Sequence, residues 1–116
     1  PLPIVKAESD GLTKNVVVLT KPRGYYKKPS KISNIVNYKK YPKVDERMKI
    51  RYKHYNDRLD YIFEQEEKGN IIVIAPSADA GVGRTTRNRD KLEQLYELGI
   101  SDAKEKCQAI KSFINE

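Results

Sequence analysis

Two short apolar runs, at about residues 15–20 and 70–75, are the segments that the hydrophobic pattern predicts as β-strands. In the first run, consecutive apolar or β-branched residues extend from Val16 to Thr20 without the alternation of a half-exposed strand. Runs of this kind are typical of parallel strands that are buried on both faces. Because about fifty residues separate the two runs, we expect the strands to be parallel and joined by a right-handed crossover.

The segment between the two runs carries the clearest helical pattern in the chain. Its apolar residues recur at spacings of three and four and form one stripe along a helix. They are Val44, Met48, Tyr52, Tyr55, Leu59, Ile62 and Phe63. Gly69 is expected to end this helix. A shorter helix before it is predicted to be capped by Ser30 and stopped by Pro42, and another is predicted near the N-terminus between Pro3 and Gly11.

Two further helices are predicted after the second strand. Asp90 and Glu93 have the spacing of a capping box at the start of the first, and Gly99 is expected to end it. Ser101 is placed to cap the second helix. The apolar stripe of this last helix comprises Ala103, Cys107, Ile110 and Ile114. Cys107 is therefore expected to pack in the core as an unreactive thiol.

The predicted order of elements, α-β-α-α-β-α-α, places the chain in the α/β class. Its length of 116 residues allows one domain, residues 1–116. Two parallel strands are too few for a self-sufficient sheet. We therefore interpret the chain as a fragment of a three-layer α/β/α fold, and we expect the isolated fragment to form a homo-oligomer that covers its exposed sheet.

The net charge of +7 is concentrated in the first half of the chain. Residues 1–60 hold 15 Lys and Arg against 6 Asp and Glu, a net charge of +9, whereas residues 61–116 have a net charge of −2. Such a basic half indicates either contact with phosphate-bearing surfaces or a solvated charged face. Tyrosines interleave with the lysines of this half, as expected at a membrane interface or on a surface that stacks nucleic-acid bases.

Parallel strands would place the residues that follow each strand at one edge of the sheet, where α/β proteins usually bind ligands. This rule brings Lys21 and Arg23 close to the small-residue loop that ends near Arg84. The candidate residues for binding an anion or a lipid headgroup are Lys21, Arg23, Lys27, Lys28, Lys39, Lys40 and Arg84. The glycines before Arg84 lack the pattern of a nucleotide-binding loop, and no cofactor is expected.

Motifs for catalysis are missing from the sequence. It contains no G-x-S-x-G pentapeptide and no D-G-[GA] motif. His54 is the sole histidine, and one histidine supplies neither a catalytic triad nor a metal site. Cys107 has no second cysteine to pair with, and no signal peptide is evident, so a reducing, cytoplasmic location is expected.

Several short motifs, in order and spacing, resemble the C-terminal part of bacterial patatin-like phospholipases. They are Pro3-Ile4 with Ala7 and Gly11; Val17-Val18-Leu19-Thr20, Pro22, Gly24-Tyr25 and Lys27-Lys28; Tyr41-Pro42; Tyr55-Asn56; and Asp90-Lys91-Leu92, Leu95-Tyr96, Leu98-Gly99 and Asp102-Ala103. The resemblance implies a three-layer α/β fold and a serine esterase or phospholipase that hydrolyses lipid acyl esters. It also implies a Ser–Asp dyad and a glycine-rich oxyanion loop, all of which would lie upstream of Pro1. No catalytic residue is carried over, so this fragment alone is expected to be inactive.

A second function remains open from the residues themselves. The chain is alternatively a stand-alone basic module that binds an anionic membrane surface or nucleic acid. Nucleic acid is the less favoured partner, because the sequence has no RNP, KH or zinc-finger pattern. Under either function, peripheral contact with an anionic membrane is an option for the basic half.

Overall fold

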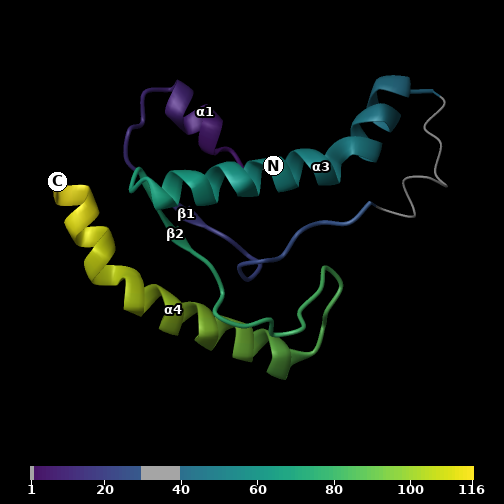
Figure 1. Cartoon of the computed structure of the whole chain (residues 1–116). Helices are drawn as coiled ribbons and strands as arrows, with labels where there is room; N and C mark the ends of the chain where they lie inside the picture. The colour runs from purple at the N-terminus through teal and green to yellow at the C-terminus, as the bar shows by residue number, and fades with distance from the viewer. Residues whose placement is uncertain (1, 30–39) are drawn as a thin grey trace.

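The computed structural model describes residues 2–29 and 40–116, and it places the chain in the α/β class (Figure 1). Its elements are α1 (Ile4–Ser9), β1 (Asn15–Val18), α3 (Pro42–Glu67), β2 (Ile71–Ile74) and α4 (Arg89–Asn115). The helix predicted after Ser30 lies outside the described residues. Pro42 is the first residue of α3, a position that suits proline because the first amide of a helix has no partner within it.

The two strands pair in parallel, as the pattern predicted. Asn15 is in register with Ile71 and Val18 with Ile74, and the Leu19 amide continues the pairing by donating to the Ile74 carbonyl at 2.8 Å. Both strands are shorter than the predicted ranges. Pro22 and Pro76 follow the strands closely and lack the amide hydrogen that a longer ladder needs.

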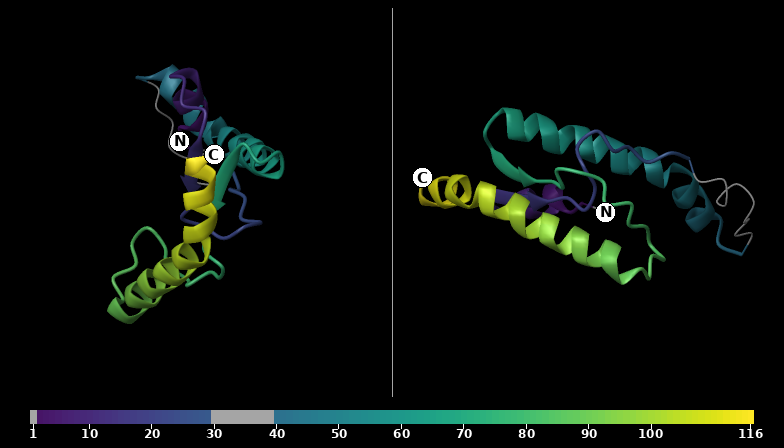
Figure 2. Two further views of the ribbon diagram at one scale, coloured as in Figure 1. Left: turned by 90° about the vertical axis from the view of Figure 1, so that its left-hand side faces the viewer. Right: turned by 90° about the horizontal axis from the view of Figure 1, so that it is seen from below.

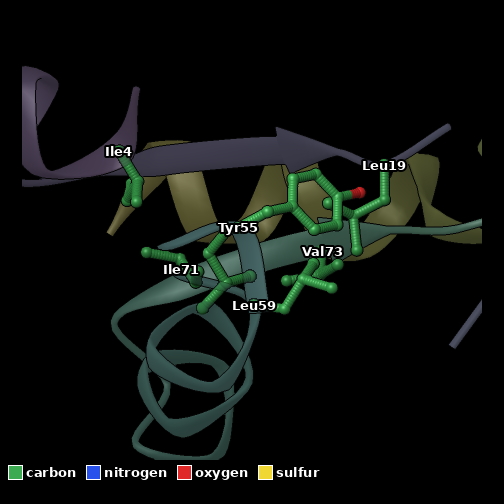
Figure 3. Close-up of a cluster of buried hydrophobic side chains, with 7 residues drawn as sticks. Ile4, Leu19, Tyr55, Leu59, Ile71 and Val73 are labelled. Carbon is green, nitrogen blue, oxygen red and sulfur yellow. The ribbon is translucent and has the colours of Figure 1, made fainter. Parts of the chain in front are cut away.

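The core lies between α3 and one face of the sheet. Ile71 and Val73 of β2 lie in this core with Leu59 of α3 (Figure 3). Ile62 of α3 belongs to the same cluster and is fully buried. The buried hydrophobic residues are Ile4, Leu19, Tyr55, Leu59, Ile62, Ile71 and Val73. The predicted stripe of α3 is thus buried in the second half of the helix, whereas Val44 near its start remains 48% exposed.

The second face of the sheet is only partly covered. α4 packs against β2 on the side opposite α3, and the views of Figures 1 and 2 agree in showing the short sheet between these two long helices. On β1, Val16 is 37% and Val18 is 65% exposed. The prediction that this strand is buried on both faces is therefore wrong: its run of valines is continuous, but one face lacks a covering layer.

α4 is one continuous helix of 27 residues. The predicted break at Gly99 and the predicted cap at Ser101 are wrong, because the residues on both sides of Gly99 favour helix strongly enough to offset its cost of about 1 kcal/mol. The helix begins with Asn88, whose side-chain oxygen accepts from the Lys91 amide at 3.0 Å, and not with the predicted capping box. Cys107 is exposed, because the face of α4 that carries it has no neighbouring element in the described structure.

Candidate anion-binding site

The loop of residues 20–29, which we call the tyrosine–lysine loop, is bound along one face of α3. Asn56 of α3 holds the backbone of Lys27 on both sides: its side-chain oxygen accepts from the Lys27 amide at 2.8 Å, and its side-chain nitrogen donates to the Lys27 carbonyl at 2.9 Å. The Tyr26 hydroxyl donates to Asp60 at 2.6 Å. These contacts fix the direction in which the side chains of the loop point.

A cleft of about 300 Å³ lies between this loop, α3 and the loop that connects β2 to α4. We call it the cationic cleft. It is lined by Tyr25, Lys27, Lys28, Met48, Arg51, Tyr52 and Arg84. Four of these side chains carry a positive charge, and no carboxylate lines the cleft among the described residues. Lys27, Arg51 and Arg84 come from three different segments of the chain, so the fold alone brings them together.

The charges of the cleft repel one another. The Lys27 ammonium lies 3.9 Å from the centroid of the Tyr55 ring, a cation–π contact that holds its position. Burial lowers the pKa of Lys27, and the nearby charges of Arg51 and Arg84 lower it further. Neither arginine has an ion-pair partner within the described part of the chain. A bound anion would relieve this repulsion.

The predicted candidates divide into those that reach the cleft and those that do not. Lys27, Lys28 and Arg84 line it. Lys21 lies nearby, and its ammonium donates to the Val82 carbonyl at 3.1 Å. This contact confirms the expected proximity of the loops that follow the two strands. Whether these residues bind an anion stays a prediction.

Three other candidates lie elsewhere. Arg23 forms two hydrogen bonds of 2.6 Å with Glu66, and this hydrogen bonding raises the pKa of Arg23 and compensates its charge. The Lys40 ammonium lies over the Tyr41 ring at 5.8 Å, outside the cleft. Lys39 falls outside the described residues.

Sequence reasoning missed Arg51, although a signal for it exists. A second stripe on α3, next to the apolar one, has spacings of four, four, three and four residues. It comprises Lys43, Arg47, Arg51, His54 and Arg58. Together with Val44 and Met48, these side chains line a shallow groove of about 710 Å³ that shares Met48 and Arg51 with the cationic cleft. The periodicity that identifies an apolar face identifies a cationic one equally well.

The one buried charged residue in the described structure, Asp102, serves the loop after β2. Its carboxylate accepts from the Ser77 amide at 2.9 Å. This hydrogen bond gives a partner to the Ser77 amide, which lies in the loop just after β2, where no strand can supply one. Among the described residues, no group of three or more metal-ligating side chains is arranged to hold a metal ion. None of the described helices contains an apolar stretch long enough to traverse a bilayer.

The fold and the cleft together define an α/β protein with a cationic cleft between the tyrosine–lysine loop, α3 and the loop before α4. The family model described as "Domain of unknown function (DUF6363)" matches residues 41–115, and the chain belongs to this family. Comparisons with curated proteins and with solved structures gave no match. The matched range includes Arg51 and Arg84, whereas Lys27 and Lys28 precede it.

Proposed function

We propose that this chain is the C-terminal, non-catalytic part of a patatin-like lipid acyl hydrolase. The observation that carries the proposal is the contact between two motifs of the resemblance. The Gly24-Tyr25 and Lys27-Lys28 motif of the loop lies against the Tyr55-Asn56 motif of α3, through the two hydrogen bonds of Asn56 and the ring of Tyr55. Because the two motifs contact each other in the fold, a change in one affects the packing of the other. This supports treating them together as a single sequence signature of the family that the chain resembles.

The uncovered part of the sheet supports the same proposal. Val16 and Val18 leave one face of β1 exposed, and a sheet of two four-residue strands is small for an α/β protein. Additional strands from a larger protein would cover this surface. In such an assembly the described residues act as scaffold, and the nucleophile comes from elsewhere.

The exposed tyrosines and lysines of the tyrosine–lysine loop suit this chain to contact a membrane surface. Tyr25 and Tyr26 of the tyrosine–lysine loop are exposed, and Lys28 next to them is exposed as well. Tyrosine side chains favour the headgroup region of a bilayer, and each lysine near an anionic surface contributes about 1 kcal/mol to binding. We propose that this surface places the parent hydrolase at an anionic membrane.

The coding sequence immediately upstream of Pro1 tests the proposal. We expect a D-G-G or D-G-A motif a few residues before Pro1, and a G-x-S-x-G pentapeptide well before that motif. An upstream sequence that encodes neither motif, or a start codon directly before Pro1, would contradict the hydrolase proposal and favour the stand-alone basic module.

A further inference from the structure

We propose that the cationic cleft is a phosphate-binding site, with Lys27, Arg51 and Arg84 as its anion-binding residues. The three side chains come from the tyrosine–lysine loop, from the middle of α3 and from the loop before α4. The site is independent of the hydrolase proposal, because it depends only on residues that the structure describes.

Of the three proposed anion-binding residues, one is held in a fixed position and two are adaptable. Lys27 is held through its backbone by Asn56 and through its ammonium by the ring of Tyr55. Arg51 and Arg84 carry exposed guanidinium groups. The planar fork of a guanidinium matches two oxygens of a phosphate, and a pre-positioned lysine adds a point charge. This combination suits a tetrahedral, multiply charged anion better than a planar carboxylate or a halide.

The convergence of cations sets the cleft apart from an ordinary charged surface. Four positive side chains from three segments of the chain line one cavity whose lining includes no carboxylate, whereas cations such as Lys49, Arg23 and Arg89 are paired with carboxylates at 2.6–2.8 Å. The cations of the cleft have no carboxylate partner among the described residues, although burial of Lys27 makes an uncompensated charge costly. A bound anion would compensate the positive charges of these side chains and so lower the free energy of the folded protein.

The size and lining of the cleft indicate a phosphate that carries an organic group. A volume of about 300 Å³ exceeds that of a bare phosphate ion and lies at the lower end of the range of small-molecule pockets. Tyr25, Tyr52 and Met48 supply apolar surface beside the charges, and the groove on α3 continues from Met48. The ligand is therefore a phosphate ester, either the headgroup of a lipid or a soluble compound.

Titration calorimetry on the whole 116-residue chain tests the site, with inorganic phosphate and glycerol 3-phosphate as probes. We expect both to bind, and we expect R51Q and R84Q each to weaken binding about tenfold or more, as for the loss of a charge-assisted hydrogen bond. K111Q is the control. It removes one positive charge from an exposed position of α4 that lines neither the cationic cleft nor the groove on α3, and it is expected to change affinity less than about twofold at 0.15 M salt, where charges more than about 8 Å apart are largely screened.

Vesicle flotation distinguishes the two sources of phosphate. Binding to phosphatidylcholine vesicles that contain phosphatidic acid, lost in R51Q and R84Q but kept in K111Q, would support the site with a lipid headgroup as its ligand. Binding of the soluble probes without binding to these vesicles would support the site with a soluble phosphate ester. If neither probe nor vesicle binds, or if K111Q weakens binding as much as R51Q, the phosphate site is overturned. Circular dichroism of each variant verifies that its fold is retained.

Discussion

Asn56 is the residue on which the position of the tyrosine–lysine loop most depends. Its side chain makes two hydrogen bonds to the half-buried backbone of Lys27. We expect Asn56→Ala to lower the free energy of unfolding by about 2 kcal/mol, since each bond contributes about 1 kcal/mol. The same substitution at Asn70, whose side chain bonds only to Gln65 at the exposed end of α3, should cost less than about 0.5 kcal/mol. Urea denaturation measures both, and equal losses would contradict this role of Asn56.

Three tyrosines are expected to ionise at higher pH than an unperturbed tyrosine. Hydrogen bonding to Asp60 raises the pKa of Tyr26, hydrogen bonding to Glu8 raises that of Tyr61, and burial raises that of Tyr55. Absorbance at 295 nm should show this late ionisation. D60N should move one tyrosine to lower pH, because it removes the carboxylate that accepts the hydrogen bond from the Tyr26 hydroxyl and that also repels the phenolate. An unchanged titration curve in D60N would contradict the contact between Tyr26 and Asp60.

The same shifts fix the sign of the pH dependence of stability. Because the folded-state pKa of these tyrosines is raised, the stability that they contribute is complete below about pH 10 and is lost as the pH rises through the folded values. Lys27 acts in the opposite direction. Because its folded-state pKa is lowered, its charge costs stability below that pKa, and this cost disappears as the pH rises from the folded-state value to the ordinary lysine value. Urea midpoints for wild type and Y26F at pH 8 and above pH 10 test the tyrosine contribution. We expect the stability difference between the two proteins to shrink at the higher pH.

At the scale of residues, sequence reasoning identified the part of the site that follows the strands. Arg84 was found because topology places the loops after parallel strands at one edge of the sheet, and Lys27 and Lys28 were found because they alternate with tyrosines in the basic half. Arg51 was not found: periodicity places it in a cationic stripe of α3, but a stripe of this kind is also typical of a solvated helix face, and only the fold brings the tyrosine–lysine loop beside it. Arg23 was predicted to be available for an anion, but the fold places it beside Glu66, which is 43 residues away in the sequence and accepts its hydrogen bonds.

Among the elements, α4 shows how a glycine can be misinterpreted from sequence. Gly99 lies inside the helix, and a Cβ at this position would meet no atom within 4 Å. We therefore expect Gly99→Ala to raise the free energy of unfolding by about 0.5–1 kcal/mol. Gly69 is the matched control: it ends α3 with φ of +75°, so Gly69→Ala should lower stability by about 1 kcal/mol. Destabilisation by Gly99→Ala would instead indicate that the helix ends at this glycine.

The two strands show what an apolar run in the sequence can predict about a strand and what it cannot. Hydrophobicity and β-branching identified both strands, and their separation identified parallel pairing. The same run of valines did not reveal that one face of β1 is exposed, because coverage depends on where α4 packs. The ends of both strands were overestimated for a local reason, since the prolines that follow them limit the ladder.

For the whole molecule, the exposed face of β1 leads us to expect self-association of the isolated chain. Val18 is 65% exposed in a strand with an open edge, and such surfaces pair with other chains. Light scattering at high micromolar concentration should show a dimer or a larger species, which Val18→Lys should shift toward the monomer. Leu12→Lys, at an exposed residue outside the sheet, is the control and should leave the association unchanged. A monomeric wild-type chain would show that the sheet needs no further cover.

The central claim is that this chain belongs to a serine lipid hydrolase whose chemistry lies outside it. The most direct measurement is to treat the intact gene product with a fluorophosphonate probe, which reacts with an activated serine, and to map the labelled residue by mass spectrometry. We predict one labelled serine N-terminal to Pro1, loss of phospholipid hydrolysis on labelling, and no label on the isolated 116-residue chain. An intact gene product that is neither labelled nor able to hydrolyse phospholipid, or a label on a serine within this chain, would contradict the account.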